Sequence, residues 1–357
     1  DAIPVFGYPG AVSFDLLLKD KDGKPRADVA LGANFQFTDA QASKLMEKID
    51  IPTINLISLY GRSEKDWRES PTGLSLFEGT FNLAVPELAG TIAPIVVGTK
   101  EKVFDKTTGL TSVITSPVVS RVDTAVARAL RYAELRRKPN AEKKIALIYY
   151  NYPPGKANIG ASYLNVAESL SNILQRLKAE GYDVGSAPLD ADSILADIST
   201  KARNVMGAAP GELQEMIATG GAERVSVPDY QKWLDAYPPS LRDKILKDWG
   251  RPEDSNLMVV REGGQASFVI PGVRYGNILL TPQPSRAWGE DADKLFHAKD
   301  LAPHHQYVAA YAWLRNGYKA DAVVHIGTHG TLEWLDGKDE AFANDVDVVD
   351  VGVWQIG

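Results

Sequence analysis

Short apolar runs alternate along the chain with amphipathic helical patterns, and this alternation is typical of α/β architecture. Early apolar runs predict strands at Val29–Phe35, Thr53–Leu59 and Ile92–Val97. Helical patterns at Ala40–Ile49 and Asp123–Arg136 lie among them. We therefore expect an α/β fold with several Rossmann-like or flavodoxin-like parallel-sheet layers and helical insertions.

The clearest βαβ unit follows a linker at residues 138–140. Lys144–Tyr150 (KIALIYY) predicts a buried strand, which leads into a turn at Asn151–Lys156. Asp183-Val184 is expected to open the next strand. Loops at the carboxyl ends of such strands are where open α/β sheets bind ligands. The helix between the strands is predicted from an apolar stripe comprising Leu164, Ala167, Leu170, Ile173, Leu174 and Leu177.

The second half of the chain predicts a helical stretch followed by strands. Asp190–Trp249 is expected to be mostly helical, and Pro303–Asn316 predicts a further helix. We expect a domain at residues 1–140, a second domain with a helical insertion at 141–275, and the start of a third at 276–357. Strands are predicted at Asn256–Val260, Ser267–Ile270, Asn277–Leu280 and Ala322–Ile326.

Composition excludes several classes of function. The 357 residues carry a net charge of -7, which gives no support for a nucleic-acid partner. The absence of cysteine excludes disulfides, thiolate metal sites and a cysteine nucleophile. No apolar run approaches the length of a membrane span. The chain starts at Asp1 without Met, and we expect a piece of a longer polypeptide.

Histidine is concentrated in the last quarter of the chain, where the strongest motif also lies. Residues 324–338 read VHIGTHGTLEWLDGK, with glycines at 327 and 330 around His329 and with Glu333 four residues later. Glycines permit a sharp turn and the close approach of a flat ligand. An imidazole and a carboxylate can hold a divalent ion and can accept protons from N–H groups. The five histidines are His297, His304, His305, His325 and His329.

Other interpretations of these residues are open or excluded. Glu333 could instead complete a capping box at a helix start. A zinc protease is disfavoured because H-E-x-x-H is absent and a glycine turn separates His325 from His329. At least one of His304 and His305 is expected to be structural or solvated. No G-x-x-x-x-G-K-[ST] motif is present, so this chain does not hold ATP in a P-loop.

The motif resembles a family signature. HIGTHGTLEWLDGK, residues 325–338, is similar to the H-x-G-T-H-G-x-L-E-x-x-P-G-K signature of CobN and the magnesium chelatase H subunits, and Trp334 is closer to CobN. Residues 282–288 (PQPSRAW), 295–307 (LFHAKDLAPHHQY) and 148–162 (IYYNYPPGKANIGAS) are similar to further CobN segments. Weaker similarities at residues 67–75, 85–90 and 249–252 extend the resemblance over essentially the whole chain.

The resemblance implies a large tetrapyrrole-binding subunit of a metal chelatase. It implies a divalent metal, Co²⁺ first and Mg²⁺ or Fe²⁺ as alternatives, with ATP hydrolysed by AAA+ partners of the CobS/CobT or ChlI/ChlD kind. Glu333 and His329 would be catalytic, and they would contact the metal together with His325. A cytoplasmic location is expected. The residues implied in macrocycle binding are His297, His305, Arg286, Trp288, Tyr152, Lys156 and Trp334.

Three departures from the family pattern flank this centre. Asp336 replaces a proline, Ala287 replaces a glycine, and the residues after Lys338 differ from the usual V-G-L-S. They leave two alternatives open. One is a haem dechelatase like the HmuS group, which would remove iron from haem and could be periplasmic or membrane-associated. The other is a tetrapyrrole-binding or sensing protein without catalysis.

Overall fold

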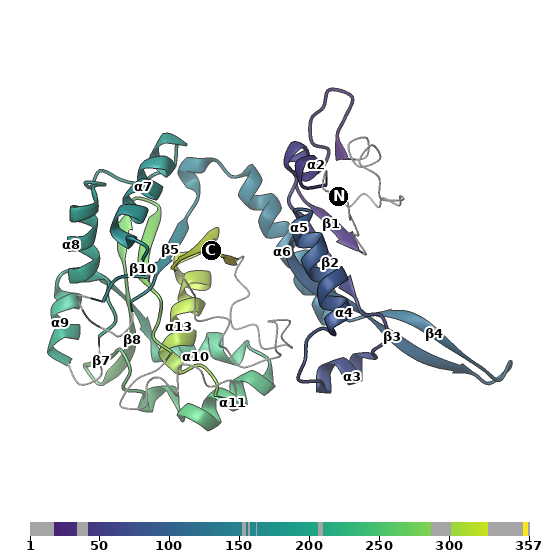
Figure 1. Ribbon diagram of the computed structural model, residues 1–357. Helices are drawn as coiled ribbons and strands as arrows, with labels where there is room; N and C mark the ends of the chain where they lie inside the picture. The colour runs from purple at the N-terminus through teal and green to yellow at the C-terminus, as the bar shows by residue number, and fades with distance from the viewer. Residues whose placement is uncertain are drawn as a thin grey trace. The chain divides into compact units, whose positions relative to one another are not determined.

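The computed structural model describes residues 18–33, 42–151, 155, 158–161, 163–205, 210–286, 301–327 and 353–355. The chain divides into two compact units (Figure 1). The first comprises Asp1–Arg137 with Lys338–Asn344, and the second comprises Lys138–Gly337 with Asp345–Gly357. No helix in the described part of the chain combines the length and the apolar character needed to cross a membrane. The division into three domains stays a prediction.

The first unit contains a four-stranded sheet in the order β1-β2-β3-β4. Its strands are β1 (Ala30–Ala33), β2 (Thr53–Ser58), β3 (Ile92–Asp105) and β4 (Leu110–Pro117). The first three are parallel, and β4 runs antiparallel to β3. The unit's helical segments are α2 (Ala42–Ile49), α3 (Glu64–Glu69), α4 (Leu76–Glu78), η1 (Gly79–Ala84), α5 (Val85–Leu88) and α6 (Val119–Arg137).

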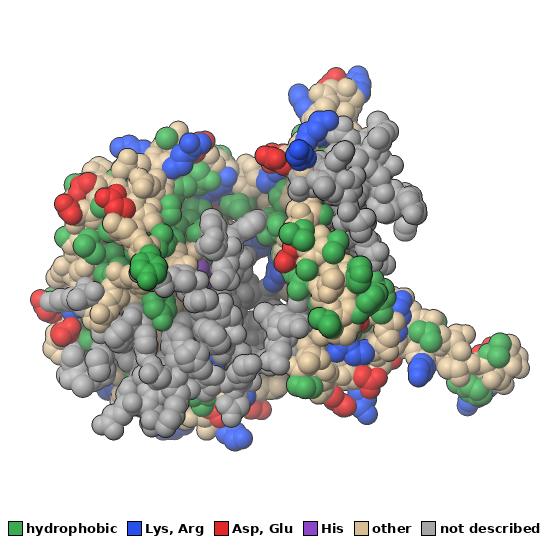
Figure 2. Space-filling model, in the orientation of Figure 1, with side chains coloured by type: hydrophobic (Ala, Val, Ile, Leu, Met, Phe, Trp, Pro, Cys, Tyr) green, Lys and Arg blue, Asp and Glu red, His purple; other side chains and the backbone are tan. Residues whose placement is uncertain are grey.

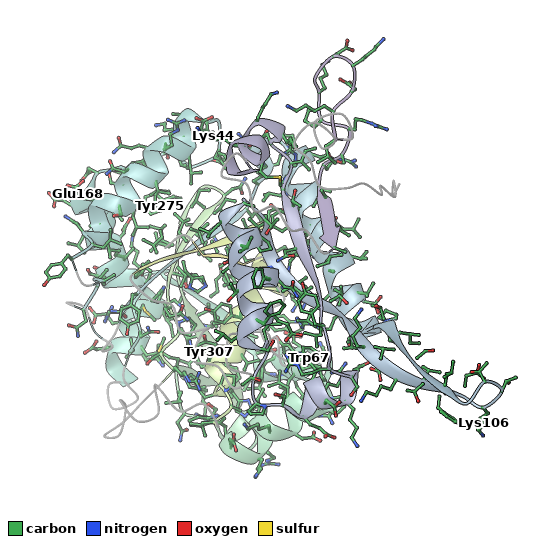
Figure 3. The ribbon with its side chains drawn as sticks, turned by 45° about the vertical axis from the view of Figure 1, so that its right-hand side comes forward. Lys44, Trp67, Lys106, Glu168, Tyr275 and Tyr307 are labelled. Carbon is green, nitrogen blue, oxygen red and sulfur yellow. The ribbon has the colours of Figure 1, made fainter. Side chains whose placement is uncertain are left out.

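The strand predicted at Ile92–Val97 is real, but it continues to Asp105 and forms a long hairpin with β4. This extension was missed because its outer residues are exposed and therefore carry no alternation of buried and exposed positions. The hairpin extends from the sheet as an arm, with Lys106 at its outer end (Figure 3).

The second unit is built on a five-stranded sheet in the order β12-β11-β5-β10-β9. Strands β5 (Ile145–Tyr149), β10 (Ile278–Pro282), β11 (Ala322–Ile326) and β12 (Val353–Gln355) are parallel, and β9 (Val273–Tyr275) is antiparallel at one edge. All residues of β5 and β10 are buried. Central parallel strands are covered on both faces, which explains their continuous apolar sequences. The α/β class with parallel sheets is thus confirmed.

Different helices cover the two faces of this sheet (Figure 1). Ala146 and Ile148 of β5 pack into one core with α10, α11 and α13. Tyr149 points to the other face, where its hydroxyl donates to the Ala202 carbonyl just after α8. The helical segments of the unit are η2 (Asn140–Glu142), α7 (Val166–Ala179), α8 (Ala191–Lys201), α9 (Pro210–Ala218), α10 (Val227–Asp235), α11 (Pro239–Trp249), η3 (Pro252–Asp254), α13 (His305–Trp313) and η4 (Leu314–Tyr318).

A three-stranded antiparallel sheet adjoins this core in the order β6-β8-β7. Its strands are β6 (Ala222–Ser226), β7 (Val259–Glu262) and β8 (Gln265–Pro271). The helical prediction for Asp190–Trp249 is confirmed for α8 to α11 but missed β6. Only one residue of β6 is buried, so its sequence lacks a clear strand pattern.

The strand predicted at Asp183-Val184 is wrong. The Asp183 carbonyl accepts one bond from the Asn277 backbone, at 2.9 Å, and its carboxylate then accepts from Gly185 N, at 2.9 Å. Gly185 turns the chain with a φ of +65°. The edge position beside β10 is taken instead by β9.

Candidate functional site

Polar residues follow the carboxyl ends of three neighbouring parallel strands in the second unit. Ile326 of β11, Tyr149 of β5 and Pro282 of β10 lie in register, so the segments after them emerge side by side. The next residues include Asn151 and Gln283, both buried. This carboxyl edge is where open α/β sheets bind ligands.

Asn204 connects two of these segments. Its side-chain Nδ2 donates to the carbonyls of Asn151, at 3.2 Å, and Gln283, at 2.8 Å. Its backbone N–H donates to Asn151 Oδ1 at 2.7 Å. Asn151 Nδ2 in turn donates to the carbonyls of Gly155 and Asn158, both at 3.0 Å. Hydrogen bonds among Asn151, Asn204 and Gln283 therefore hold together the ends of β5 and β10 and the segment that follows β5.

His325 lies at this edge, near the end of β11. Its ring stacks on Tyr311 of α13, with centroids 6.3 Å apart and planes 18° apart. Burial lowers the pKa of His325 to about 4, so the imidazole is neutral near pH 7. Within the described residues, its buried Nε2 has no hydrogen-bond partner. A neutral, buried imidazole nitrogen without a partner is suited to bind a metal ion or an N–H group.

Tyr311 is itself held in place by Gln283. The Gln283 amide donates to the Tyr311 hydroxyl at 2.8 Å, and that hydroxyl lies 3.2 Å from Gln283 Oε1. Burial is the main cause that raises the pKa of Tyr311 well above its ordinary value, so the hydroxyl stays protonated. The aromatic surface against His325 is thereby fixed through β10.

Arg286 lies after β10, and His304 lies at the start of α13. His304 caps α13, because its Nδ1 accepts from Tyr307 N at 3.2 Å, while its Nε2 lies 2.5 Å from the Ser285 carbonyl. Burial lowers the pKa of His304 to about 4. Arg286 is buried and donates to the Leu301 carbonyl at 3.3 Å. His304 is therefore a neutral structural cap.

His305 points elsewhere, although it neighbours His304 in sequence. Its Nδ1 lies 2.9 Å from the Tyr230 hydroxyl and its Nε2 lies 3.0 Å from the Gly250 carbonyl. A carbonyl can only accept, so Nε2 carries the proton and Nδ1 accepts. Burial is the main cause that lowers the pKa of His305. Because both ring nitrogens are occupied, this geometry favours a structural role over contact with a ligand.

The structure thus places some of the predicted site residues. His325 and Arg286 lie in segments at or after the carboxyl edge, and His305 is directed to Tyr230. Among the described residues, no group of three or more His, Asp or Glu is arranged to hold a metal ion. The predicted residues outside the described part of the chain are Glu333, His329, His297, Trp288, Tyr152, Lys156 and Trp334.

Sequence reasoning missed three residues of the site. Gln283 stands inside the segment 282–288 that carries the resemblance, so it could have been singled out. Tyr311 and Asn204 gave no local signal, because Tyr311 is one apolar position of a helix and Asn204 follows a helix end.

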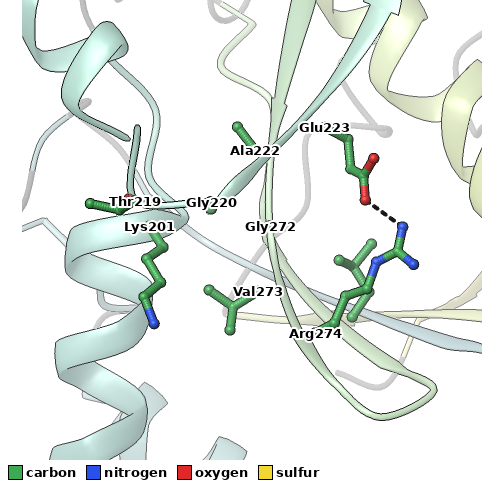
Figure 4. A pocket seen from close by; sticks show the side chains of 10 residues that line it. Lys201, Thr219, Gly220, Ala222, Glu223, Gly272, Val273 and Arg274 are labelled. Carbon is green, nitrogen blue, oxygen red and sulfur yellow. Dashed lines mark hydrogen bonds and ion pairs between the residues drawn. The ribbon is translucent and has the colours of Figure 1, made fainter. Parts of the chain in front are cut away.

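A cavity of about 310 Å³ lies elsewhere in the second unit (Figure 4). It is lined by Leu279, near the start of β10, and therefore does not open at the carboxyl edge. Its two cations are paired: Lys201 with Asp197 at 2.6 Å, and Arg274 with Glu223. Since these charges are compensated and neither His325 nor Tyr311 lines the cavity, we assign the functional site to the carboxyl edge.

A family profile described as CobN/Magnesium Chelatase matches residues 3–350. The chain belongs to this family. The aerobic cobaltochelatase subunit CobN of Pseudomonas aeruginosa is 32% identical over 329 residues, covering 90% of this chain and 25% of the relative. The chloroplastic magnesium-chelatase subunit ChlH of Oryza sativa subsp. indica is 32% identical over 299 residues, covering 84% of this chain and 20% of the relative.

The fold is also similar to a solved structure. The catalytic subunit of cobaltochelatase from Mycobacterium tuberculosis superimposes with a TM-score of 0.71 at 29% identity, covering 87% of this chain and 25% of that one. The chain therefore spans about a quarter of the length of these relatives. The predicted resemblance to chelatase large subunits is confirmed.

Proposed function

We propose that this chain forms part of the large subunit of a metal chelatase and inserts a divalent metal, Co²⁺ in the first instance, into a corrin- or porphyrin-type macrocycle. The observation that carries the proposal is the neutral, buried imidazole of His325, whose Nε2 has no partner in the described part of the chain. His325 stands two residues before Gly327, the first glycine of the motif. Family membership supports the same reaction class.

Insertion exchanges two pyrrole protons for one divalent ion. Glu333 and His329 would accept these protons, and His325 would contact the metal as it passes, since a neutral imidazole is a good ligand for borderline divalent ions. Tyr311 and Gln283 would hold the His325 ring in orientation. The macrocycle would contact residues from the segments after the strands, namely Arg286, Trp288, Tyr152, Lys156, His297 and Trp334. A contact with His305 has the least support, because both of its ring nitrogens already have partners within the protein.

Separate AAA+ subunits would supply ATP hydrolysis, because this sequence has no P-loop motif. We place the reaction in the cytoplasm. Magnesium and iron remain alternative metals under this proposal.

Visible absorption titration with a metal-free porphyrin, a metal-free corrinoid and haem, before any partner or ATP is added, tests the proposal. We expect binding of a metal-free macrocycle without conversion. Conversion to the metal complex should then follow when Co²⁺, ATP and AAA+ subunits are supplied. Loss of the haem spectrum without partners would instead establish the dechelatase alternative.

Two substitutions locate the chemistry. Glu333→Gln should abolish conversion while macrocycle binding is retained, and Glu262→Gln provides a control because Glu262 is an exposed carboxylate paired with Arg224. His325→Gln should lower conversion more than binding. Full conversion by both site variants would refute the assigned roles, and binding without any conversion by the unsubstituted protein would indicate a tetrapyrrole-binding or sensing protein.

A further inference from the structure

Asn204 is held in place just after the end of α8, although it belongs to no helix or strand. The preceding Arg203 donates from Nη1 to the Thr200 carbonyl at 2.8 Å, in the last turn of the helix. The following Val205 N–H donates to the Met258 sulfur at 3.3 Å. The side chain of Asn204 is 0% exposed. A buried residue that is fixed on both sides is suited to hold other segments in position.

The Asn204 amide continues the hydrogen bonding of the sheet beyond its last paired residues. Strands β5 and β10 are paired as far as Tyr149↔Pro282, and the Gln283 N–H still donates to the Tyr149 carbonyl at 2.7 Å. Past this point Asn204 Nδ2 donates to the carbonyls of Asn151 and Gln283. These carbonyls fix the orientation of the amide, because an oxygen in place of Nδ2 would face two acceptors. Asn204 therefore replaces strand pairing where the two strands end.

The groups that Asn204 joins are uncharged. Figure 2 shows Lys, Arg, Asp and Glu side chains along the outer margin of the second unit, whereas the buried bonds of Asn204 join amides and backbone carbonyls. Asn204 Oδ1 is also buried and has no hydrogen-bond partner in the described part of the chain, which lowers stability. A residue that lowers stability at one atom while it orders two segments is typical of a functional site.

One branch of this network leads from Asn204 to the segment after β5. Asn151 accepts from the Asn204 backbone N–H at 2.7 Å, and its Nδ2 donates to the carbonyls of Gly155 and Asn158. Residues 152–156 of this stretch include two of the proposed macrocycle contacts. The position of the stretch therefore depends on Asn204.

The other branch leads from Asn204 to His325. The Gln283 carbonyl accepts from Asn204, and the Gln283 side-chain amide bonds the Tyr311 hydroxyl at 2.8 Å. The Tyr311 ring stacks on the His325 imidazole. Because Gln283 and Tyr311 are 4% and 1% exposed, neither side chain can turn into solvent. The orientation of His325 therefore depends on the same asparagine.

We propose that Asn204 is a positioning residue that fixes the segment after β5 relative to His325. The inference rests on the proposed function, in which that segment contacts the macrocycle and His325 contacts the metal. Metal transfer requires the imidazole and the macrocycle to be held at one separation, since a misplacement of about 1 Å can cost about 100-fold in rate. Asn204 touches neither ligand and acts through Asn151 and Gln283.

Asn204→Ser tests the proposal, because it removes the two-donor amide without adding a charge. Absorption titration with a metal-free porphyrin and a metal-free corrinoid measures the macrocycle Kd. Conversion at saturating macrocycle, with Co²⁺, ATP and AAA+ subunits, measures the branch to His325. The Kd should rise by about fivefold and the conversion rate should fall by about fivefold or more, since each branch loses a hydrogen bond. Partial unfolding alone lowers the number of binding sites and the rate, but it leaves the Kd of the remaining sites unchanged.

Two further variants separate the branches from general effects. Tyr311→Phe interrupts only the branch to His325, so conversion should fall by about fivefold while the macrocycle Kd stays within about twofold. Asn277→Ser is the matched control, because Asn277 Nδ2 donates to the Ala141 carbonyl at 2.9 Å but lies just before β10, at the amino end of the strand. Its Kd and conversion rate should stay within about twofold of the unsubstituted protein.

Circular dichroism at the assay temperature shows whether each variant is folded. If Asn204→Ser does not fold, Asn204→Asp gives the same two measurements, because it keeps the volume of the side chain and removes the same two donors at pH 7.

A folded Asn204 variant whose Kd matches that of the unsubstituted protein overturns the proposal, whether or not its rate falls, because the segment after β5 then does not depend on this residue. A raised Kd with an unchanged conversion rate overturns it as well, since His325 is then positioned independently. Absence of conversion by the unsubstituted protein refutes the proposed function itself, and the inference fails with it.

Discussion

The side-chain amide of Gln306 is buried in α13 in a way that lowers the free energy of unfolding. Its side chain is 1% exposed, and neither Oε1 nor Nε2 has a hydrogen-bond partner in the described structure. Gln283, at 4% exposed, is the matched case, because its amide bonds the Tyr311 hydroxyl. The same substitution to leucine at both positions therefore separates a bonded buried amide from an unbonded one.

The magnitude follows from the hydrogen bonds. A buried polar group without a partner costs about 1–3 kcal/mol, and leucine removes it while filling a similar volume. Gln306→Leu should raise the free energy of unfolding by about 2 kcal/mol, which corresponds to an increase in Tm of about 4–8 °C for a unit of this size. Gln283→Leu should lower the free energy of unfolding by about 1–3 kcal/mol, since the buried Tyr311 hydroxyl loses its hydrogen bond to Gln283.

Differential scanning calorimetry of the two variants and the unsubstituted chain at pH 7 tests this pair. The transition of the second unit is the one that should shift, because both residues belong to it. If Gln306→Leu lowers Tm as Gln283→Leu does, then the Gln306 amide makes a stabilising interaction and the reasoning from its burial is refuted.

Two further predictions concern protons and glycines. Burial lowers the pKa of both His304 and His325 from 6.5 to about 4, so below pH 6.5 the unfolded chain takes up protons that the folded chain refuses. The free energy of unfolding should therefore decrease by about 1.4 kcal/mol per pH unit for each histidine as the pH is lowered from 6.5 to 4. When this free energy is measured by urea unfolding at several pH values, it should depend less steeply on pH in His325→Phe than in the unsubstituted chain. Gly221→Ala should destabilise the fold by about 3 kcal/mol in thermal melts, because the added Cβ would lie 2.3 Å from the Lys201 carbonyl oxygen. Gly211→Ala is the control: an added Cβ there meets no atom within 4 Å, so this variant should be neutral or more stable by about 0.5 kcal/mol. Equal effects of the two alanines would contradict the contact argument.

The sequence by itself determined the elements whose signal is local. Residues 144–150 predicted β5 because a central parallel strand buries every side chain, so its apolar run is continuous. The apolar stripe on α7 predicted a helix because a periodicity of 3.6 residues can be recognised from the sequence of a single segment. The motif around His325 identified the family, since a family signature depends on residue types at fixed spacing, and it predicted a site beyond the end of the strand at Ile326.

Only the tertiary structure decided how these elements are used. His304 and His305 are consecutive, yet one caps α13 and the other bonds Tyr230 and Gly250. The place beside β10 goes to β9, because the chain turns at Gly185 before it can form a strand. Which groups a side chain meets depends on segments far away in sequence, and local periodicity carries no information about them. The environment of His325 is of this kind: the sequence supplies the imidazole, its burial beside Tyr311 of α13 makes it neutral, and among the described residues its Nε2 meets no hydrogen-bond partner.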